Sequence, residues 1–394
     1  MNKKSISAWS GGSILMGAMA AFAAFSTHCT SMGMAPEGER LERMKASPRY
    51  SDGHFRNDAE MPEKPNFFAV MWKFLWNNAN TEPAIHPATL DRQAADFDRA
   101  PIDGLRITWF GHASVLLELD GKKILLDPVW GQRVSPVGFA GPQRFYAPPM
   151  PLEELSRLQI DAVVISHDHY DHLDYPTIMA LAKTETIFIV PLGVGSHLEY
   201  WGISKERIKE LDWWDSVDAA GIRYTATPAQ HFSGRTLSDR DTTLWAGFAI
   251  QGISKKIFYS GDTGYFAGFK EIGKRLGPFD LSIMAIGAYD KQWAAVHLTP
   301  EEAVQAHKDI GGGLFLPVHW GTFNLAFHPW TEPIQRTLQA ARENGVEVVA
   351  PAPGEILEGA HPVAFSRWWE ETKLAENAES AGPAGLTEPQ EVGN

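Results

Sequence analysis

Several potential metal ligands lie within one hexapeptide of this chain, HDHYDH at 167–172. The hexapeptide follows a short apolar run, so the chain leaves a buried strand directly into it. His167 and His169 are two residues apart in this extended segment, so both imidazoles can reach one ion. Asp171 and His172 follow in a turn that can face a second ion. Because a single-metal site needs only three protein ligands and a water, the surplus predicts two metals and hydrolytic chemistry.

Three distant residues extend this set, namely His231, Asp262 and His319, each at the end of an apolar, strand-like stretch. Glycine or another small residue lies beside each of them, which lets the backbone turn sharply close to an ion. A single histidine is more often an ordinary hydrogen-bonded residue than a ligand. The order of the three after the hexapeptide favours metal ligation over a solvated polar loop.

The ordered set resembles the signature of the metallo-β-lactamase superfamily, which is HxHxDH followed by His, a bridging Asp and His. The resemblance implies an α/β (α+β) fold, the αββα sandwich of two mixed sheets flanked by helices. It also implies two zinc ions, although iron or manganese suits similar nitrogen and oxygen ligands. In this assignment His167, His169 and His231 hold the first metal, Asp171, His172 and His319 hold the second, and Asp262 bridges both.

A narrower resemblance rests on segments between about 105 and 353 that generic members of the superfamily lack. These segments are WFGHAS at 109–114, DPVW at 127–130, SP at 135–136, GPQRF at 141–145, QHFSGR at 230–235, SGDTGY at 260–265, PEEAV at 300–304 and HWGTF at 319–323. They look like the N-acyl-phosphatidylethanolamine-hydrolysing phospholipase D family. The resemblance implies that a hydroxide bridging two metals cleaves a phosphodiester of N-acylated ethanolamine phospholipids, giving N-acylethanolamine and phosphatidic acid.

Asp171 and His297 are the candidate catalytic residues. His297 precedes a helix that Thr299 is expected to cap, at a position that the resemblance places beside the substrate phosphate. It could donate a hydrogen bond to a phosphate oxygen or protonate the leaving group; alternatively, it makes a local bond at the helix end. His112 is either a structural loop residue or part of the site wall, and His307 is expected to be structural.

Strand-like runs supply the frame for these residues. They lie at 106–109, 114–119, 123–126, 162–165, 187–190, 223–226, 245–250, 256–259, 281–285, 314–317 and 347–349. Early hairpins followed by mixed strands and helices fit a two-sheet sandwich, with the ligands on loops at one end of the sheets. Carboxylates or carbonyls behind the ligands are expected to fix the tautomers of the histidine rings, and Asp168 and Asp174 are candidates for this role.

Residues 1–30 are predicted to be a signal peptide or an N-terminal anchor. Two lysines precede an apolar stretch at 14–25, which is short for a membrane span and rich in small residues, as in export signals. Cys29 follows and is a candidate for lipid attachment, although His28 fits a lipoprotein cleavage site poorly. We expect an exported protein, periplasmic or membrane-associated. Cys29 is also the only cysteine, so β-lactamase classes with a cysteine ligand are a poor match.

The remaining chain divides into three parts. Residues 31–100 form an N-terminal extension with an aromatic-rich helix around 67–76. This helix either docks onto the catalytic core or forms an apolar wall that holds acyl chains or touches a membrane surface. Residues 101–368 form the catalytic domain. Residues 369–394 are rich in Ala, Glu, Gly and Pro and are predicted to be a disordered tail.

Charge limits the partners. The formal net charge is −13, and no cluster of Lys and Arg forms a stripe, so nucleic acid is not expected as a partner. A phospholipid or another small ester is the expected substrate. The alternatives are a lactonase or other small-ester hydrolase, and a non-catalytic envelope lipid-binding protein, which the complete ligand set disfavours. The sequence makes no prediction of oligomeric state.

Overall fold

The computed structural model of the chain describes residues 30–380, apart from 60, 62–69, 71, 74, 75, 77, 78, 362 and 363. No helix in this part of the chain is long and apolar enough to cross a membrane. The export signal or anchor and the lipidation at Cys29 stay predictions, because 1–29 lie outside the described residues. Most of the aromatic-rich stretch at 67–76 lies outside them too.

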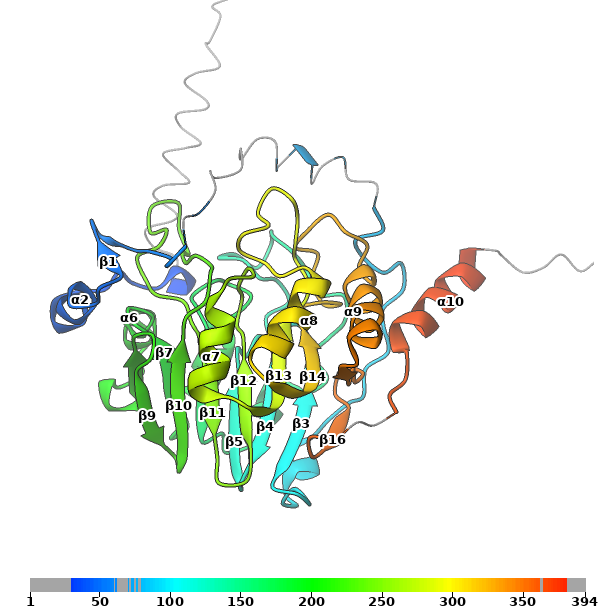
Figure 1. The fold of residues 1–394 in the computed structure, drawn as a ribbon, viewed down its shortest axis with the longest axis horizontal. Helices are drawn as coiled ribbons and strands as arrows, with labels where there is room; N and C mark the ends of the chain where they lie inside the picture. The colour runs from blue at the N-terminus through cyan, green and yellow to red at the C-terminus, as the bar shows by residue number, and fades with distance from the viewer. Residues whose placement is uncertain are drawn as a thin grey trace, which may run out of the picture.

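Two mixed sheets form the centre of the molecule (Figure 1). The first has the order β16-β3-β4-β5-β6-β7-β8 and is antiparallel from β16 to β5 and parallel from β5 to β8. Its strands are β3 (Leu105–Trp109), β4 (Val115–Leu119), β5 (Lys122–Leu126), β6 (Ala162–Val164), β7 (Ile187–Pro191), β8 (Ile208–Leu211) and β16 (Ile356–Glu358).

The second sheet has the order β15-β14-β13-β12-β11-β10-β9, antiparallel from β9 to β12 and parallel from β12 to β15. Its strands are β9 (Ser216–Ala219), β10 (Ile222–Thr227), β11 (Gly247–Gln251), β12 (Lys256–Tyr259), β13 (Phe279–Ala285), β14 (Gly312–Val318) and β15 (Glu347–Val348). Figure 1 shows three helices in front of this sheet, α7 (Gly268–Leu276), α8 (Pro300–Asp309) and α9 (Glu332–Asn344).

The alternation of side chains along β4 shows how the layers are held together. Val115, Leu117 and Leu119 belong to the core that also contains residues of the second sheet, whereas Leu116 belongs to a core on the other face. That second core includes residues of the remaining helices of the domain, α4 (Leu152–Leu155), α5 (Tyr175–Leu181) and α6 (Gly195–Tyr200). Both faces of the sheet are therefore covered, and the predicted αββα sandwich is confirmed.

Every predicted strand is present. The short hairpin at 50–55 was missed, and so were β8, β9 and β16 of the two large sheets, which all lie at sheet edges. Along β9, with the sequence SVDA, the four residues are exposed, intermediate, exposed and buried. Only Val217 and Ala219, on one face of the strand, are apolar. Edge strands carry polar residues because one side faces water, so their hydrophobic signal is weak.

The prediction of a disordered tail from residue 369 is wrong for 369–380. These residues belong to α10 (Trp368–Ser380). Trp369 is fully buried, and Trp368 stacks on Trp320 with ring centroids 5.1 Å apart. The prediction relied on the polar composition of the segment and overlooked the two tryptophans at its start, which pack against the core and attach the helix to it. Residues 381–394 lie outside the described part.

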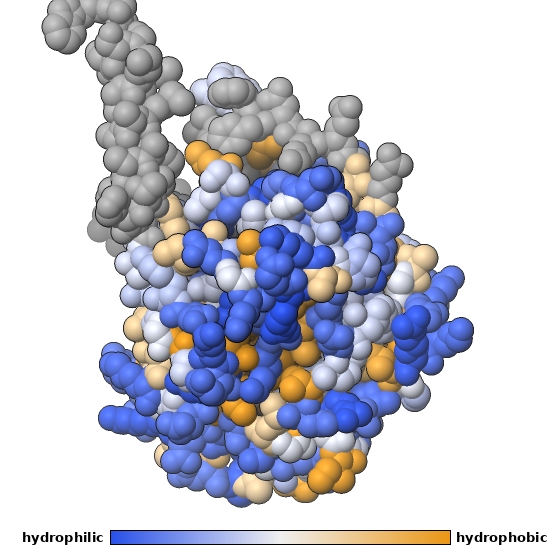
Figure 2. Space-filling model, turned by 90° about the vertical axis from the view of Figure 1, so that its left-hand side faces the viewer, coloured by the Kyte–Doolittle hydropathy of each residue, from blue (hydrophilic) through white to orange (hydrophobic). Residues whose placement is uncertain are grey.

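The N-terminal extension contains η1 (Thr30–Met32), α2 (Gly38–Lys45), the hairpin β1 (Tyr50–Ser51) and β2 (His54–Phe55), and η2 (Ala94–Phe97); η3 (Lys205–Arg207) precedes β8. Figure 2 shows the side of the molecule that carries α2, where hydrophilic side chains predominate.

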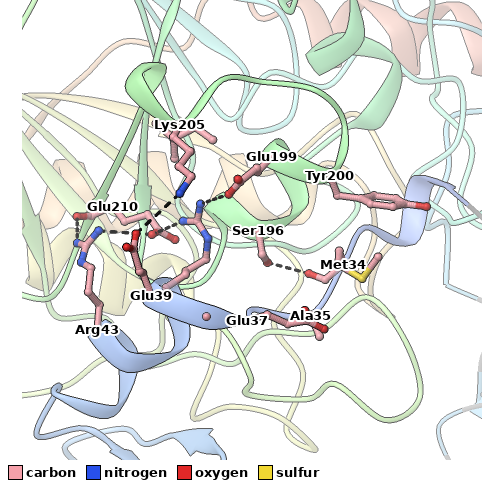
Figure 3. Close-up of a pocket in the computed structure, with 13 residues that line it drawn as sticks. Met34, Ala35, Glu37, Glu39, Arg43, Ser196, Glu199, Tyr200, Lys205 and Glu210 are labelled. Atoms are coloured by element: carbon pink, nitrogen blue, oxygen red, sulfur yellow. Dashed lines mark hydrogen bonds and ion pairs between the residues drawn. The ribbon is translucent and has the colours of Figure 1, made fainter.

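Ion pairs attach α2 to the first sheet (Figure 3). Arg40 pairs with Glu210 and with Glu199, the latter at 2.9 Å, and Arg43 lies 3.6 Å from Glu210. The side chain of Glu210 is only 2% exposed, and it also accepts hydrogen bonds from the backbone of Gly193 and Gly195. Because the charges in this cluster are paired, it holds the extension in place.

Candidate metal centre

Four strands from the two sheets deliver the seven predicted ligands to one place. The hexapeptide follows β6, His231 follows β10, Asp262 follows β12, and His319 comes directly after β14. Gly261 has φ +55°, and a Cβ there would lie 2.6 Å from that of Ser166. Only glycine lets the loop of the second sheet approach the end of β6 so closely.

The first group consists of three imidazoles, of which His167 and His231 are buried and His169 is partly buried. Nδ1 of His169 lies 2.8 Å from Nε2 of His167 and 3.3 Å from Nε2 of His231. Burial lowers the pKa of His167 and His231 well below the usual value, and it lowers the pKa of His169 as well. The rings are therefore neutral, which is the form that binds a metal.

The second group surrounds two carboxylates. Oδ2 of Asp171 lies 3.3 Å from Nε2 of His319 and 3.4 Å from Nε2 of His172. Oδ2 of Asp262 lies 3.1 Å and 3.2 Å from the same two nitrogens, and 3.8 Å from Nε2 of His231. Asp262 thus stands between the two groups, as the bridging assignment requires.

The pKa values in this group follow from burial opposed by close charges. Burial alone would raise the pKa of Asp262, but His172 and His319 hold it well below its usual value. Burial alone would lower the pKa of His319, but Asp262 and Asp171 raise it to about 9. A place that attracts protons this strongly attracts a divalent cation for the same electrostatic reason.

The donor set fits two metal ions. Ligands of a tetrahedral ion with bonds of roughly 2.0–2.1 Å are spaced about 3.3 Å apart, close to the ligand separations above. Among the described side chains, Nε2 of His172, both ring nitrogens of His319 and Oδ1 of Asp262 are buried without a hydrogen-bond partner. Such groups are costly unless something ligates them.

Ring orientation is fixed by a carboxylate and a carbonyl. Asp127 is fully buried, and its Oδ2 accepts hydrogen bonds from Nδ1 of His172 at 2.6 Å and from the Tyr259 hydroxyl at 2.5 Å. Nδ1 of His231 donates to the carbonyl of Val296 at 3.0 Å. Each bond fixes the tautomer that leaves Nε2 available for a metal.

The expectation that Asp168 or Asp174 would fix ligand rings is wrong. Asp168 accepts hydrogen bonds from Gly234 and Thr243 and faces His197, which is not a ligand, and Asp174 caps α5. Sequence reasoning missed Asp127. Its position directly after β5, beside β6 in the same sheet, was the available signal.

A cavity of about 540 Å³ opens beside the ligands. Its other described lining residues come from the N-terminal extension and from three loops; they are Asn57, Met61, Val70, Phe232, Arg240, Asp241, Ala288, Gln292, Trp293, Ala295, Val296, His297 and Leu325. Met61 and Val70 place the extension in the wall of the site.

Asn57 ties the extension to a ligand. Its Oδ1 accepts a hydrogen bond from the backbone nitrogen of His231 at 3.1 Å, and its Nδ2 donates to the carbonyl of His231 at 2.8 Å. The indole of Trp245 also donates to Asn57 Oδ1. No motif or spacing in the sequence singles out this residue.

The extra histidines lie in different places. His297 lines the cavity with Nδ1 3.9 Å from Asp262, and burial lowers its pKa to about 4. His112 is buried and donates from Nε2 to Asp171 at 3.0 Å, so it lies behind a predicted ligand and does not line the cavity. His307 lies on α8 and bonds Ser282, away from the ligands.

A family model described as the beta-lactamase superfamily domain matches residues 122–320. The chain belongs to the metallo-β-lactamase superfamily. An uncharacterised Mycobacterium tuberculosis member is 44% identical over 331 residues, covering 82% of this chain and 87% of the relative. N-acyl-phosphatidylethanolamine-hydrolyzing phospholipase D 1 of Caenorhabditis elegans is 41% identical over 274 residues, covering 65% and 76%.

Solved members of the superfamily share the fold. A metallohydrolase from the archaeon Ignicoccus hospitalis superposes with a TM-score of 0.50 at 24% identity, covering 64% of this chain and 97% of that one. The superfamily, the homologous phospholipases and the clustered ligands identify this chain as a metal-dependent hydrolase.

Proposed function

We propose that this hydrolase cleaves the phosphodiester of N-acylated ethanolamine phospholipids in the manner of a phospholipase D, giving N-acylethanolamine and phosphatidic acid. One observation carries the proposal: the clustered ligand groups open into a cavity whose wall is mostly apolar, with a few polar side chains. A phosphodiester lipid needs both features. The relative of the same stated activity supports it at 41% identity.

Two zinc ions are the proposed metals, with iron or manganese fitting the same donors. When bound, they supply an activated water near neutral pH and neutralise charge on the phosphate. His167, His169 and His231 would hold one ion, Asp171, His172 and His319 the other, and Asp262 both.

The rest of the cavity positions the lipid. Met61, Val70, Trp293 and Leu325 provide apolar surface for an acyl chain and keep water away from the reacting phosphate. His297 lies beside Asp262 with Nδ1 unbonded, so its ring can donate a hydrogen bond to the departing oxygen.

Membrane contact is part of the proposal. Trp72 and Trp76 are each 65% exposed, with ring centroids 5.5 Å apart, and lie close in sequence to Val70, which lines the cavity. Exposed tryptophans suit the lipid–water interface. We expect co-sedimentation with phosphatidylcholine vesicles that falls in a Trp72→Ala, Trp76→Ala double variant; equal co-sedimentation would contradict the contact.

The test of function is hydrolysis of N-acyl-phosphatidylethanolamine by the metal-loaded protein, with products identified by mass spectrometry. His169→Ala is the control, with circular dichroism to confirm its fold. Both products from the wild type alone would support the proposal. No product from protein that carries two metals would contradict it, and turnover of lactones instead would identify a lactonase.

A further inference from the structure

The cavity beside the metal ligands contains one fixed positive charge. Among its described lining residues, Arg240 is the only lysine or arginine. It lies in the loop between His231 and β11. Two contacts with the extension hold its backbone: the His54 ring bonds the carbonyl of Arg240 at 2.9 Å, and Phe55 donates to the carbonyl of Asp241 at 2.7 Å.

The Phe232 ring contacts both this guanidinium and the rings of two predicted metal ligands. The Arg240 guanidinium carbon lies 4.1 Å from the centroid of the Phe232 ring. That ring lies 4.5 Å from the ring of His169 and 4.7 Å from the ring of His231. The cation–π contact restricts where the guanidinium can move, so less freedom is lost when a ligand binds it.

The side-chain donors of Arg240 make no hydrogen bond within the described part of the chain. Its Nε is buried without a hydrogen-bond partner, and no hydrogen bond from its terminal nitrogens is found within the described part of the chain. Among the described residues it forms one ion pair, between its Nε and Asp241 at 3.4 Å, and the side chain is 41% exposed. Arg235, in the same loop, is buried and donates to the carbonyls of Ser31, Asp168 and Leu173.

We propose that Arg240 is a specificity-determining residue that binds a negatively charged oxygen of the substrate phosphodiester. This inference rests on the proposed function, since it assumes a phosphodiester substrate. The planar donors of arginine match phosphate oxygens. A neutral lactone or carboxylic ester offers no such charge, so Arg240 favours anionic substrates over neutral ones of similar size.

The test compares Arg240→Met and Arg240→Lys with the wild type, on bis(4-nitrophenyl) phosphate and on neutral 4-nitrophenyl acetate. Arg240→Met is expected to raise KM for the diester by about 10-fold or more, with kcat little changed and KM for the neutral ester unchanged. Arg240→Lys should recover part of the loss. Equal KM values for the diester, or equal rises for both substrates, would overturn the proposal.

The matched control is Arg223→Met, because Arg223 is 56% exposed and paired with Asp218 on the hairpin of β9 and β10. It should leave both KM values unchanged. Metal content is measured for every variant.

A second measurement separates this inference from the proposed function. Isothermal titration calorimetry of dimethyl phosphate against the metal-loaded proteins needs no turnover. Weaker binding to Arg240→Met than to wild type and Arg223→Met would support the role of Arg240, even if the wild type hydrolysed no phospholipid. No binding to the wild type, or equal affinity for all three proteins, would overturn it.

Discussion

Asn57→Ala is expected to weaken the metal centre, although Asn57 belongs to the extension and is no ligand. The substitution removes both hydrogen bonds between the Asn57 amide and the backbone of His231. The indole of Trp245 keeps a partner, because it also donates to the carbonyl of Ala229 at 3.0 Å. The substitution therefore weakens mainly the loop that carries His231.

The size of the effect follows from those two bonds. At about 1 kcal/mol net for each, the free energy of unfolding should fall by about 2 kcal/mol. Loss of an outer partner of a ligand costs roughly 10–100-fold in metal affinity. Because Val296 still orients the ring of His231, we expect about 10-fold, the lower end of that range.

Metal affinity is measured by competition with a chromophoric chelator, and stability by denaturant unfolding. Asn344→Ala is the matched control, because Asn344 also makes two hydrogen bonds through its amide, with Lys308 and Ala340, at the end of α9. It should lose similar stability and keep its metals. Wild-type metal affinity in Asn57→Ala would refute the idea that the extension supports His231.

Three further outcomes are expected. Asp262→Asn should abolish hydrolysis and lower metal content while the circular dichroism spectrum is kept; full turnover would exclude the bridging assignment. Burial lowers the pKa of His307 to about 4, so its stabilising contribution is complete above about pH 6.5 and is lost as the pH falls toward 4. Between pH 7.5 and 4, wild type should therefore lose about 3 kcal/mol more unfolding free energy than His307→Leu in denaturant titrations, and equal losses would contradict this. Trp369→Ala should cost about 3–5 kcal/mol, measured the same way; a loss below about 1 kcal/mol would show that α10 is dispensable.

The sequence alone determined the sandwich and the place of the ligands. Short apolar runs predicted the inner strands, and polar residues directly after them predicted His167, Asp262 and His319 as ligands at one end of the sheets. These predictions succeeded because the apolar pattern of a strand is visible in a few consecutive residues, and because few residue types bind a hydrolytic metal. The edge strand β9 and helix α10 were not predicted, because they are stabilised by contacts with neighbouring elements of the fold.

Only the tertiary structure decided what surrounds the ligands. Asn57 meets His231 across 174 residues of sequence, and Asp127 meets His172 across 45. Arg240 lies over the ring of Phe232 and lines the cavity, and this placement leaves its side-chain donors free for a ligand. Such contacts depend on how two sheets and a distant extension pack together. The hydrophobic pattern drives this packing, but it does not specify which polar groups will come into contact.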